Sequence, residues 1–225
     1  EPITIELGFR LKPEPERRYS LLPRRTGRLL EPVDVQASID LVHDARLDAT
    51  VARRFCIAYK DVDIELLMDG GNLLSITVNG EEMPTGVGNY HVEQGDQLFP
   101  VVSPKGRGSK RSFGPQVIDL ELEQVLLKQL DGVFHGGTQD YTRSQIARTL
   151  GQGARHAMRE NMRHAQSDSD YWKRQVDRLS DSKFEAIRQT VIALGVPELI
   201  RLINREAREA FQNVIYAPPL RAAAQ

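Results

Sequence analysis

The chain has 225 residues, a formal net charge of −1 at pH 7, 40% apolar residues and 27% charged residues. A globular chain of this length can bury one large or two small hydrophobic cores, and this composition argues against wholesale disorder. The near-neutral charge argues against a protein that is positive over its whole surface. Any surface for nucleic acid would therefore have to be local.

The single cysteine, Cys56, lies in the apolar run RFCIAY, where we expect it to pack as a small hydrophobic residue. One cysteine builds neither a disulfide framework nor a clustered Cys/His metal site. There is no apolar run of about 18 residues, and the start EPITIELGF lacks the layout of a signal peptide. We therefore expect a cytoplasmic protein without a cofactor or a membrane partner. Because Glu1 is not a methionine, an upstream leader or domain remains an alternative.

The first part of the chain alternates between apolar and polar residues, as half-buried strands do. The alternating apolar positions are Ile3, Ile5, Leu7, Phe9 and Leu11, then Val33, Val35, Ala37, Ile39 and Leu41, then Val62, Ile64, Leu66 and Met68. The last set continues through the turn DGGN into a returning strand, which is typical of a hairpin. We predict a β-rich domain over residues 1–104, an antiparallel sandwich or partly rolled sheet, with a helical or irregular insertion near residues 43–55.

The second part changes to helical spacing, and we predict a helical domain over residues 117–216 and an unstructured tail over residues 217–225. Gly195 can provide a left-handed helix end, and Pro197 suits the first turn of a following helix. This pair predicts an αα-hairpin with helices over residues 183–194 and 197–215. The predicted fold class is therefore α+β, an N-terminal β-rich domain followed by a C-terminal helical domain that ends in an αα-hairpin.

The segment YTRSQIARTLGQGARHAMRENMR, residues 141–163 and here called the arginine-rich segment, is the first candidate site. Ala147, Gly151 and Ala157 match the small residue, turn glycine and apolar residue of helix-turn-helix units. Five arginines are opposed in this segment only by Glu160, namely Arg143, Arg148, Arg155, Arg159 and Arg163. The last three are spaced by four along one helix face, where they could meet successive phosphates. The alternative is a structural corner whose arginines pair with acidic neighbours.

A second candidate is the glycine-rich stretch PKGRGSKRSFG, which we assign to a linker over residues 105–116. Glycine lets a backbone approach a phosphate, and the cations that would neutralise it are Lys105, Arg107, Lys110 and Arg111. The arrangement is similar to the glycine-rich loop of the RAMP-type RNA-binding proteins of CRISPR systems, and that resemblance implies RNA contact. The alternative is an exposed linker between two domains.

Tyr171 and the only tryptophan, Trp172, lie beside Lys173 and Arg174, and aromatic residues with arginine are typical of interaction surfaces. The alternative is that Trp172 docks its helix on a neighbouring helix. We find no arrangement of a nucleophile with a base and no metal-ligand spacing, so we expect a protein that is not an enzyme.

These patterns lead to two hypotheses for function. The first is a non-catalytic nucleic-acid-binding protein, helix-turn-helix-like, that contacts phosphates of DNA or RNA through the five arginines and the four linker cations. The second is a structural or adaptor subunit of a larger protein assembly, for example a phage particle, a secretion machine or a ribonucleoprotein complex. In either case the chain could form an oligomer.

Overall fold

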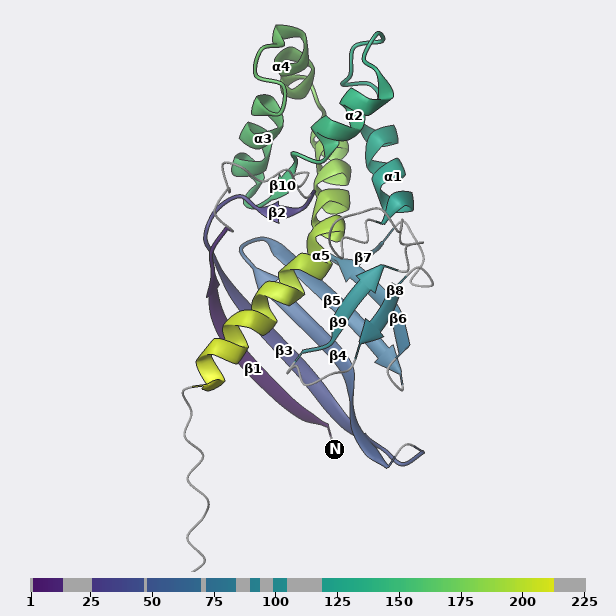
Figure 1. Cartoon of the computed structure of the whole chain (residues 1–225), viewed down its shortest axis with the longest axis vertical. Helices are drawn as coiled ribbons and strands as arrows, with labels where there is room; N and C mark the ends of the chain where they lie inside the picture. Colours follow the sequence, from purple (N-terminus) through teal and green to yellow (C-terminus); the bar gives the residue numbers. More distant parts are fainter. Residues whose placement is uncertain are drawn as a thin grey trace, which may run out of the picture.

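An antiparallel sheet followed by helices makes up the fold (Figure 1), in agreement with the predicted α+β class. The structure is a computed structural model that describes residues 2–13, 26–46, 48–69, 72–83, 90–93, 99–104 and 119–212. The predicted linker over residues 105–116 and the predicted tail over residues 217–225 lie outside these residues.

Within the described ranges the main sheet has six strands, each antiparallel to its neighbours in the order β1-β3-β4-β5-β6-β7. Their bounds are β1 (Ile3–Leu11), β3 (Val33–Asp44), β4 (Ala49–Tyr59), β5 (Val62–Asp69), β6 (Asn72–Val78) and β7 (Glu81–Glu82). Two smaller sheets pair β2 (Arg28–Leu29) with β10 (Gly151–Gln152) and β8 (Tyr90–Glu93) with β9 (Val101–Pro104). The helical or irregular insertion predicted near residues 43–55 is wrong, because this part of the chain ends β3 and begins β4. The β-branched and aromatic residues of β4 favour a strand there.

Five helices follow within the described residues. They are α1 (Leu120–Leu130), α2 (Asp140–Ala147), α3 (Arg155–His164), α4 (Asp170–Asp177) and α5 (Asp181–Gln212). Asp119 caps α1, because its side chain accepts hydrogen bonds from the backbone N–H groups of Glu121 and Leu122, and Ser169 caps α4 in the same way through Trp172 N–H. The short helices α1 to α4 surround the first half of α5 at one end of the molecule (Figure 1).

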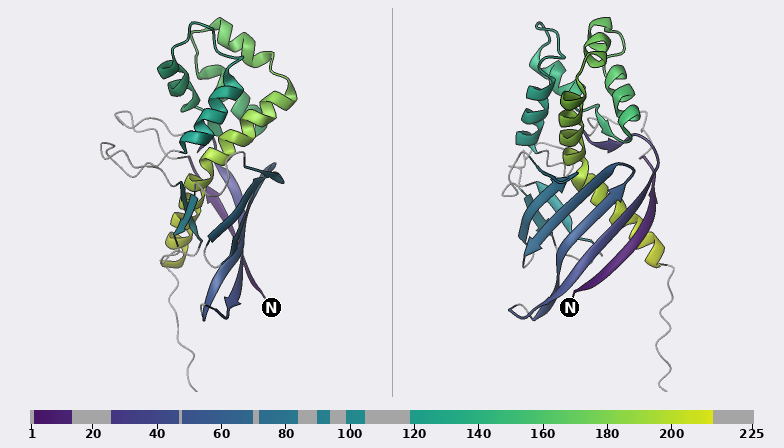
Figure 2. Two further views of the ribbon diagram at one scale, coloured as in Figure 1. Left: turned by 90° about the vertical axis from the view of Figure 1, so that its right-hand side faces the viewer. Right: turned by 180° about the vertical axis from the view of Figure 1, so that it is seen from behind.

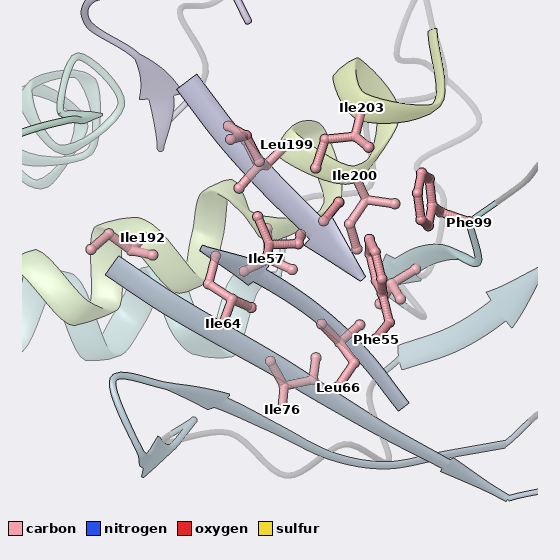
Figure 3. Packing of buried hydrophobic residues seen from close by; sticks show 14 of the residues in the cluster. Phe55, Ile57, Ile64, Leu66, Ile76, Phe99, Ile192, Leu199, Ile200 and Ile203 are labelled. Atoms are coloured by element: carbon pink, nitrogen blue, oxygen red, sulfur yellow. The ribbon is translucent and has the colours of Figure 1, made fainter. Parts of the chain in front are cut away.

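The alternation in the strands places one face of the sheet in a hydrophobic core. On β5, Ile64 and Leu66 are buried while Asp63 is exposed. The second half of α5 and the small β8–β9 sheet lie on the buried face (Figure 2), and Phe55 on β4 stacks on Phe99 with ring centroids 4.9 Å apart (Figure 3). In the described part of the chain the main sheet is thus a single layer, covered on one face by the second half of α5 and by the small β8–β9 sheet.

The predicted αα-hairpin is wrong, because α5 is one helix from Asp181 to Gln212 with Pro197 inside it. Gly195 has helical and not left-handed backbone angles, so it does not end the helix. Proline removes one intrahelical hydrogen bond and bends a helix, and α5 bends in this region (Figure 1). Phe211, close to the end of α5, is 49% exposed.

Helix α5 takes part in two hydrophobic cores. Phe184, Ile187 and Val191 pack with α1 to α4, whereas Leu199 and Ile203 pack on the sheet. Leu194 lies between them and contacts both cores. One continuous helix therefore holds the helical part and the sheet together.

Candidate functional site: the arginine-rich segment

The arginine-rich segment forms α2, β10 and α3. Between the two helices, Gly151 and Gln152 pair in parallel with Arg28 and Leu29 of β2. A Cβ atom at position 151 would lie 2.7 Å from the backbone carbonyl oxygen of Arg28, its partner in β2, so this strand contact favours glycine. The segment is thus helix, strand and helix, and not the tight turn that the helix-turn-helix spacing indicated.

Helix α3 turns its apolar side inward and its arginines toward neighbouring helices. Met158 and Met162, spaced by four, are fully buried in the core of the helical part, while Ala157 is half-buried. Ala147, at the end of α2, is also fully buried. The small and apolar residues of the predicted motif therefore serve packing within the bundle.

Arg155 and Arg159 lie against the start of α5. Arg155 Nη2 donates to Asp181 Oδ1 at 2.7 Å, and Arg159 Nη2 lies 3.6 Å from the same carboxylate oxygen. Both guanidinium groups also lie over the ring of Phe184, 5.4 Å and 4.6 Å from its centroid. A cation over an aromatic face is attracted by the ring, so these two arginines help to attach α3 to α5.

The other three arginines of the segment also have carboxylate partners. Arg163 lies 3.1 Å from Glu160 and 3.2 Å from Asp177. Arg148 binds Glu123 on α1 at 2.9 Å, and Arg143 binds Asp131 at 2.8 Å and lies over Phe134. The side chains of the five arginines are between 24% and 46% exposed. Each one is thus part of an ion pair that joins it to its own helix or to another element.

Charge is balanced over the whole helical part. Residues 119–212 contain as many Asp and Glu residues as Lys and Arg residues. The local excess of positive charge in residues 141–163 is offset by acidic residues on other helices. Of these helices, α1 precedes the segment in the sequence, and α4 and α5 follow it. The linker cations Lys105, Arg107, Lys110 and Arg111 lie outside the described residues.

Tyr171 and Trp172 have different positions although they are adjacent. Trp172 is fully buried, lies tilted against the Phe134 ring with centroids 5.4 Å apart, and donates its indole N–H to the Met162 carbonyl at 2.6 Å. It therefore docks α4 in the bundle and has no surface to offer a partner. Tyr171 is 36% exposed and meets the His135 ring edge-on with centroids 5.3 Å apart.

A polar junction between the sheet and the helical part was missed by the sequence reasoning. Glu31 accepts a hydrogen bond from Ala154 N–H at the start of α3 and also binds Lys60 in the β4–β5 turn. The Lys60 hydrogen bond and then the Ala154 N–H hold the pKa of Glu31 below its usual range. Glu31 thereby caps a helix whose own preceding residue, Ala154, has no side chain that could do so.

The second half of this junction contains Arg188, which is only 2% exposed. It binds Asp61 at 2.9 Å and Glu185 at 3.0 Å. Nearby, Tyr59 on β4 donates its hydroxyl to Gln152 Oε1 at 2.6 Å, and burial raises the pKa of that tyrosine. A buried charge needs its partners, so these contacts fix the β4–β5 turn against α5 and β10.

Among the described residues, no group of three or more His, Cys, Asp and Glu side chains is placed to hold a metal ion. In the same part of the chain, no helix has the length and apolar character needed to cross a membrane. Comparisons with known proteins find no matching family model, curated protein or solved structure.

Proposed function

We propose that this protein is a non-catalytic structural or adaptor subunit of a larger assembly, with mainly protein partners. The observation that carries the proposal is the internal pairing of the arginine-rich segment. Its five arginines, which would be the phosphate contacts of a nucleic-acid-binding protein, already join α2 and α3 to their neighbours.

Electrostatics also favours an assembly subunit over a nucleic-acid-binding protein. A phosphate that approached Arg155, Arg159 or Arg163 would also meet the carboxylates that pair with them. Asp181, Glu160 and Asp177 are 86%, 55% and 50% exposed. These negative charges would repel a phosphate at short range and would lose their partners if the arginines turned away.

The surface also exposes large apolar side chains that a protein partner would cover. They are Ile3, Leu67, Leu74, Leu120, Tyr141, Tyr171 and Phe211. Isolated exposed apolar residues are ordinary, but aromatic residues such as Tyr141, which is 74% exposed, are enriched at protein interfaces. We retain a cytoplasmic location as part of the proposal, supported by the single cysteine.

The proposal is tested by comparing protein and nucleic-acid binding of the same preparation. We expect a mass in light scattering that rises with concentration or with an added cell extract, and no mobility shift of DNA or RNA at low salt. A strict monomer that captures no protein would count against the proposal. A mobility shift that is lost when Arg155, Arg159 and Arg163 are changed to Ala would instead support the nucleic-acid hypothesis, since phosphate contacts weaken steeply with salt and with lost cations.

A further inference from the structure

Strand β1 forms one edge of the main sheet and is long and regular. It pairs with β3 in unbroken register from Ile3 opposite Leu41 to Leu11 opposite Val33. Among the described residues, no strand pairs with its other side. The backbone N–H and C=O groups on that side form a regular row of hydrogen-bond donors and acceptors. Another extended polypeptide can pair with such a row as an added strand. The opposite edge ends in β7, which has only two residues.

The side chains of β1 that face α5 are less covered than those of the neighbouring strand. Ile3 is 64% exposed, and Ile5, Leu7 and Phe9 are half-buried. On β3, by contrast, Val35, Ala37 and Ile39 are at most 2% exposed. The end of α5 extends past β1 (Figure 1), and it carries the exposed Phe211. A further strand with apolar residues on this side would cover β1 as β1 covers β3.

The other face of β1 carries two charges that a partner strand could complement. Arg10 lies opposite Asp34, but the nitrogen–oxygen distance is 3.9 Å and both side chains are more than 70% exposed. Glu6 lies opposite Ser38, and no ion pair of Glu6 occurs within the described part of the chain. Opposite charges on directly facing residues of adjacent strands stabilise their pairing.

We propose that β1 accepts an antiparallel extended segment of a different protein as a seventh strand. That segment would have apolar residues at alternate positions, a basic residue opposite Glu6 and an acidic residue opposite Arg10. This segment would belong to a protein partner of the assembly subunit proposed above, so its existence rests on that proposed function. A second copy of β1 also carries an acid and a base at this spacing. However, pairing two copies about a two-fold axis would direct the two α5 ends at one another, because both extend past β1 on the same face (Figure 1).

The test uses two synthetic peptides based on β3, the strand that already pairs with β1. The matched probe is VDVQAKIDL, which is residues 33–41 with Ser38→Lys, so that it places a base opposite Glu6 and keeps Asp34 opposite Arg10. The control is VKVQAEIDL, with Asp34→Lys and Ser38→Glu, which has the same length, alternation and net charge but like charges at both positions. Binding to the full chain is measured by fluorescence anisotropy.

We expect the matched probe to bind roughly tenfold more tightly than the control, since two exposed cross-strand charge pairs change from attraction to repulsion. The double variant Glu6→Lys, Arg10→Glu, which changes two exposed side chains, should bind the control more tightly than the matched probe. Amide hydrogen exchange should show new protection in residues 3–11 when the matched probe is bound.

Three results would overturn the inference: equal binding of the two peptides, no reversal in a folded double variant, or protection of all amides in residues 3–11 before any probe is added. A concentration-dependent dimer that Glu6→Lys abolishes and the double variant restores would identify a second copy as the occupant, against the proposal. If neither peptide binds but protein partners bind elsewhere on the chain, this inference is wrong and the proposed function stands. Capture of nucleic acid and of no protein would instead refute the function itself.

Discussion

The backbone of Gly27 contacts the backbone of Gly195 in the middle of α5. A Cβ atom on Gly195 would lie 2.3 Å from the Gly27 carbonyl oxygen, and one on Gly27 would lie 2.4 Å from the Gly195 nitrogen. Gly27 also has a φ of 76°, a conformation that other residues rarely adopt. Two glycines distant in sequence thus allow the segment before β3 to pass directly against the helix that joins the two cores.

Changing Gly195 to Ala should therefore destabilise the protein, although alanine in a helix normally stabilises by about 1 kcal/mol relative to glycine. The contact with Gly27 involves backbone atoms that cannot move aside, and overpacking of this kind costs about 1–3 kcal/mol. Urea unfolding measures the change. Gly136→Ala is the matched control, because no atom lies within 4 Å of a Cβ there, and its midpoint should stay close to that of the parent. A more stable Gly195→Ala protein would show that the two segments are not in contact.

Arg159→Ala should lower the free energy of unfolding by about 1 kcal/mol, because it removes a cation–π contact with Phe184 and an ion pair with Asp181. Arg174→Ala on α4 is the control. Within the described part of the chain this exposed arginine makes no ion pair and no aromatic contact, so its replacement should change the free energy of unfolding by close to zero. Thermal melts of both variants make the comparison. Equal stability of the two would mean that Arg159 is available for another role.

Asp61→Ala should cost about 1–3 kcal/mol, because Arg188 is buried and would keep only Glu185 as a partner. Asp63→Ala, two residues later on an exposed position of β5, removes the same group without touching Arg188 and should be nearly neutral. The free energies of unfolding in urea give the difference. The role of Arg188 in the junction would be refuted by two equally small effects.

Acid should weaken the Glu31 contact. The pKa of Glu31 in the folded protein lies below the ordinary value of 4.5, so its contribution to stability is complete above that value and is lost as the pH falls through the lower, folded pKa. The Glu31→Gln variant can still accept a hydrogen bond from Ala154 N–H. When the pH is lowered from neutral to about 3, this variant should therefore lose less stability than the parent. Glu81→Gln on β7 controls for the loss of a carboxylate. Parallel pH profiles of parent and Glu31→Gln would contradict the assignment.

Trp172 should report a dry environment. The side chain is fully buried and its N–H is bonded to Met162, so its fluorescence should resist quenching by iodide and move to longer wavelength only on unfolding. Denatured protein provides the quenching reference. Strong quenching in the folded state would place the tryptophan at the surface and revive its role as a contact residue.

The strands were largely predictable because their alternation depends only on neighbouring residues. Ile64 and Leu66 are buried and Asp63 is exposed, as the period of two requires. The continuity of α5 was not predictable in this way. Gly195 and Pro197 have the local character of a helix break, but the glycine serves the contact with Gly27, a residue whose position depends on the complete fold.

The arginine-rich segment shows the same limit for function. The spacing of Arg155, Arg159 and Arg163 correctly indicated one helix face, but the sequence does not show which acidic residues that face meets. Asp181 and Glu185 lie on a helix that begins well after α3 ends. Pairing across elements is a tertiary property, so local charge counts could not distinguish a phosphate contact from an internal ion pair.

The continuity of α5 also orders the events of synthesis. The long strands of the main sheet are complete by Val78, but the helix that covers their apolar face begins only at Asp181. During translation, Phe55, Leu66 and their neighbours must remain without their final cover until the second half of α5 has left the ribosome. The nascent chain therefore passes through a stage with an uncovered apolar sheet, which is the kind of surface that chaperones bind and that aggregates when it is left alone.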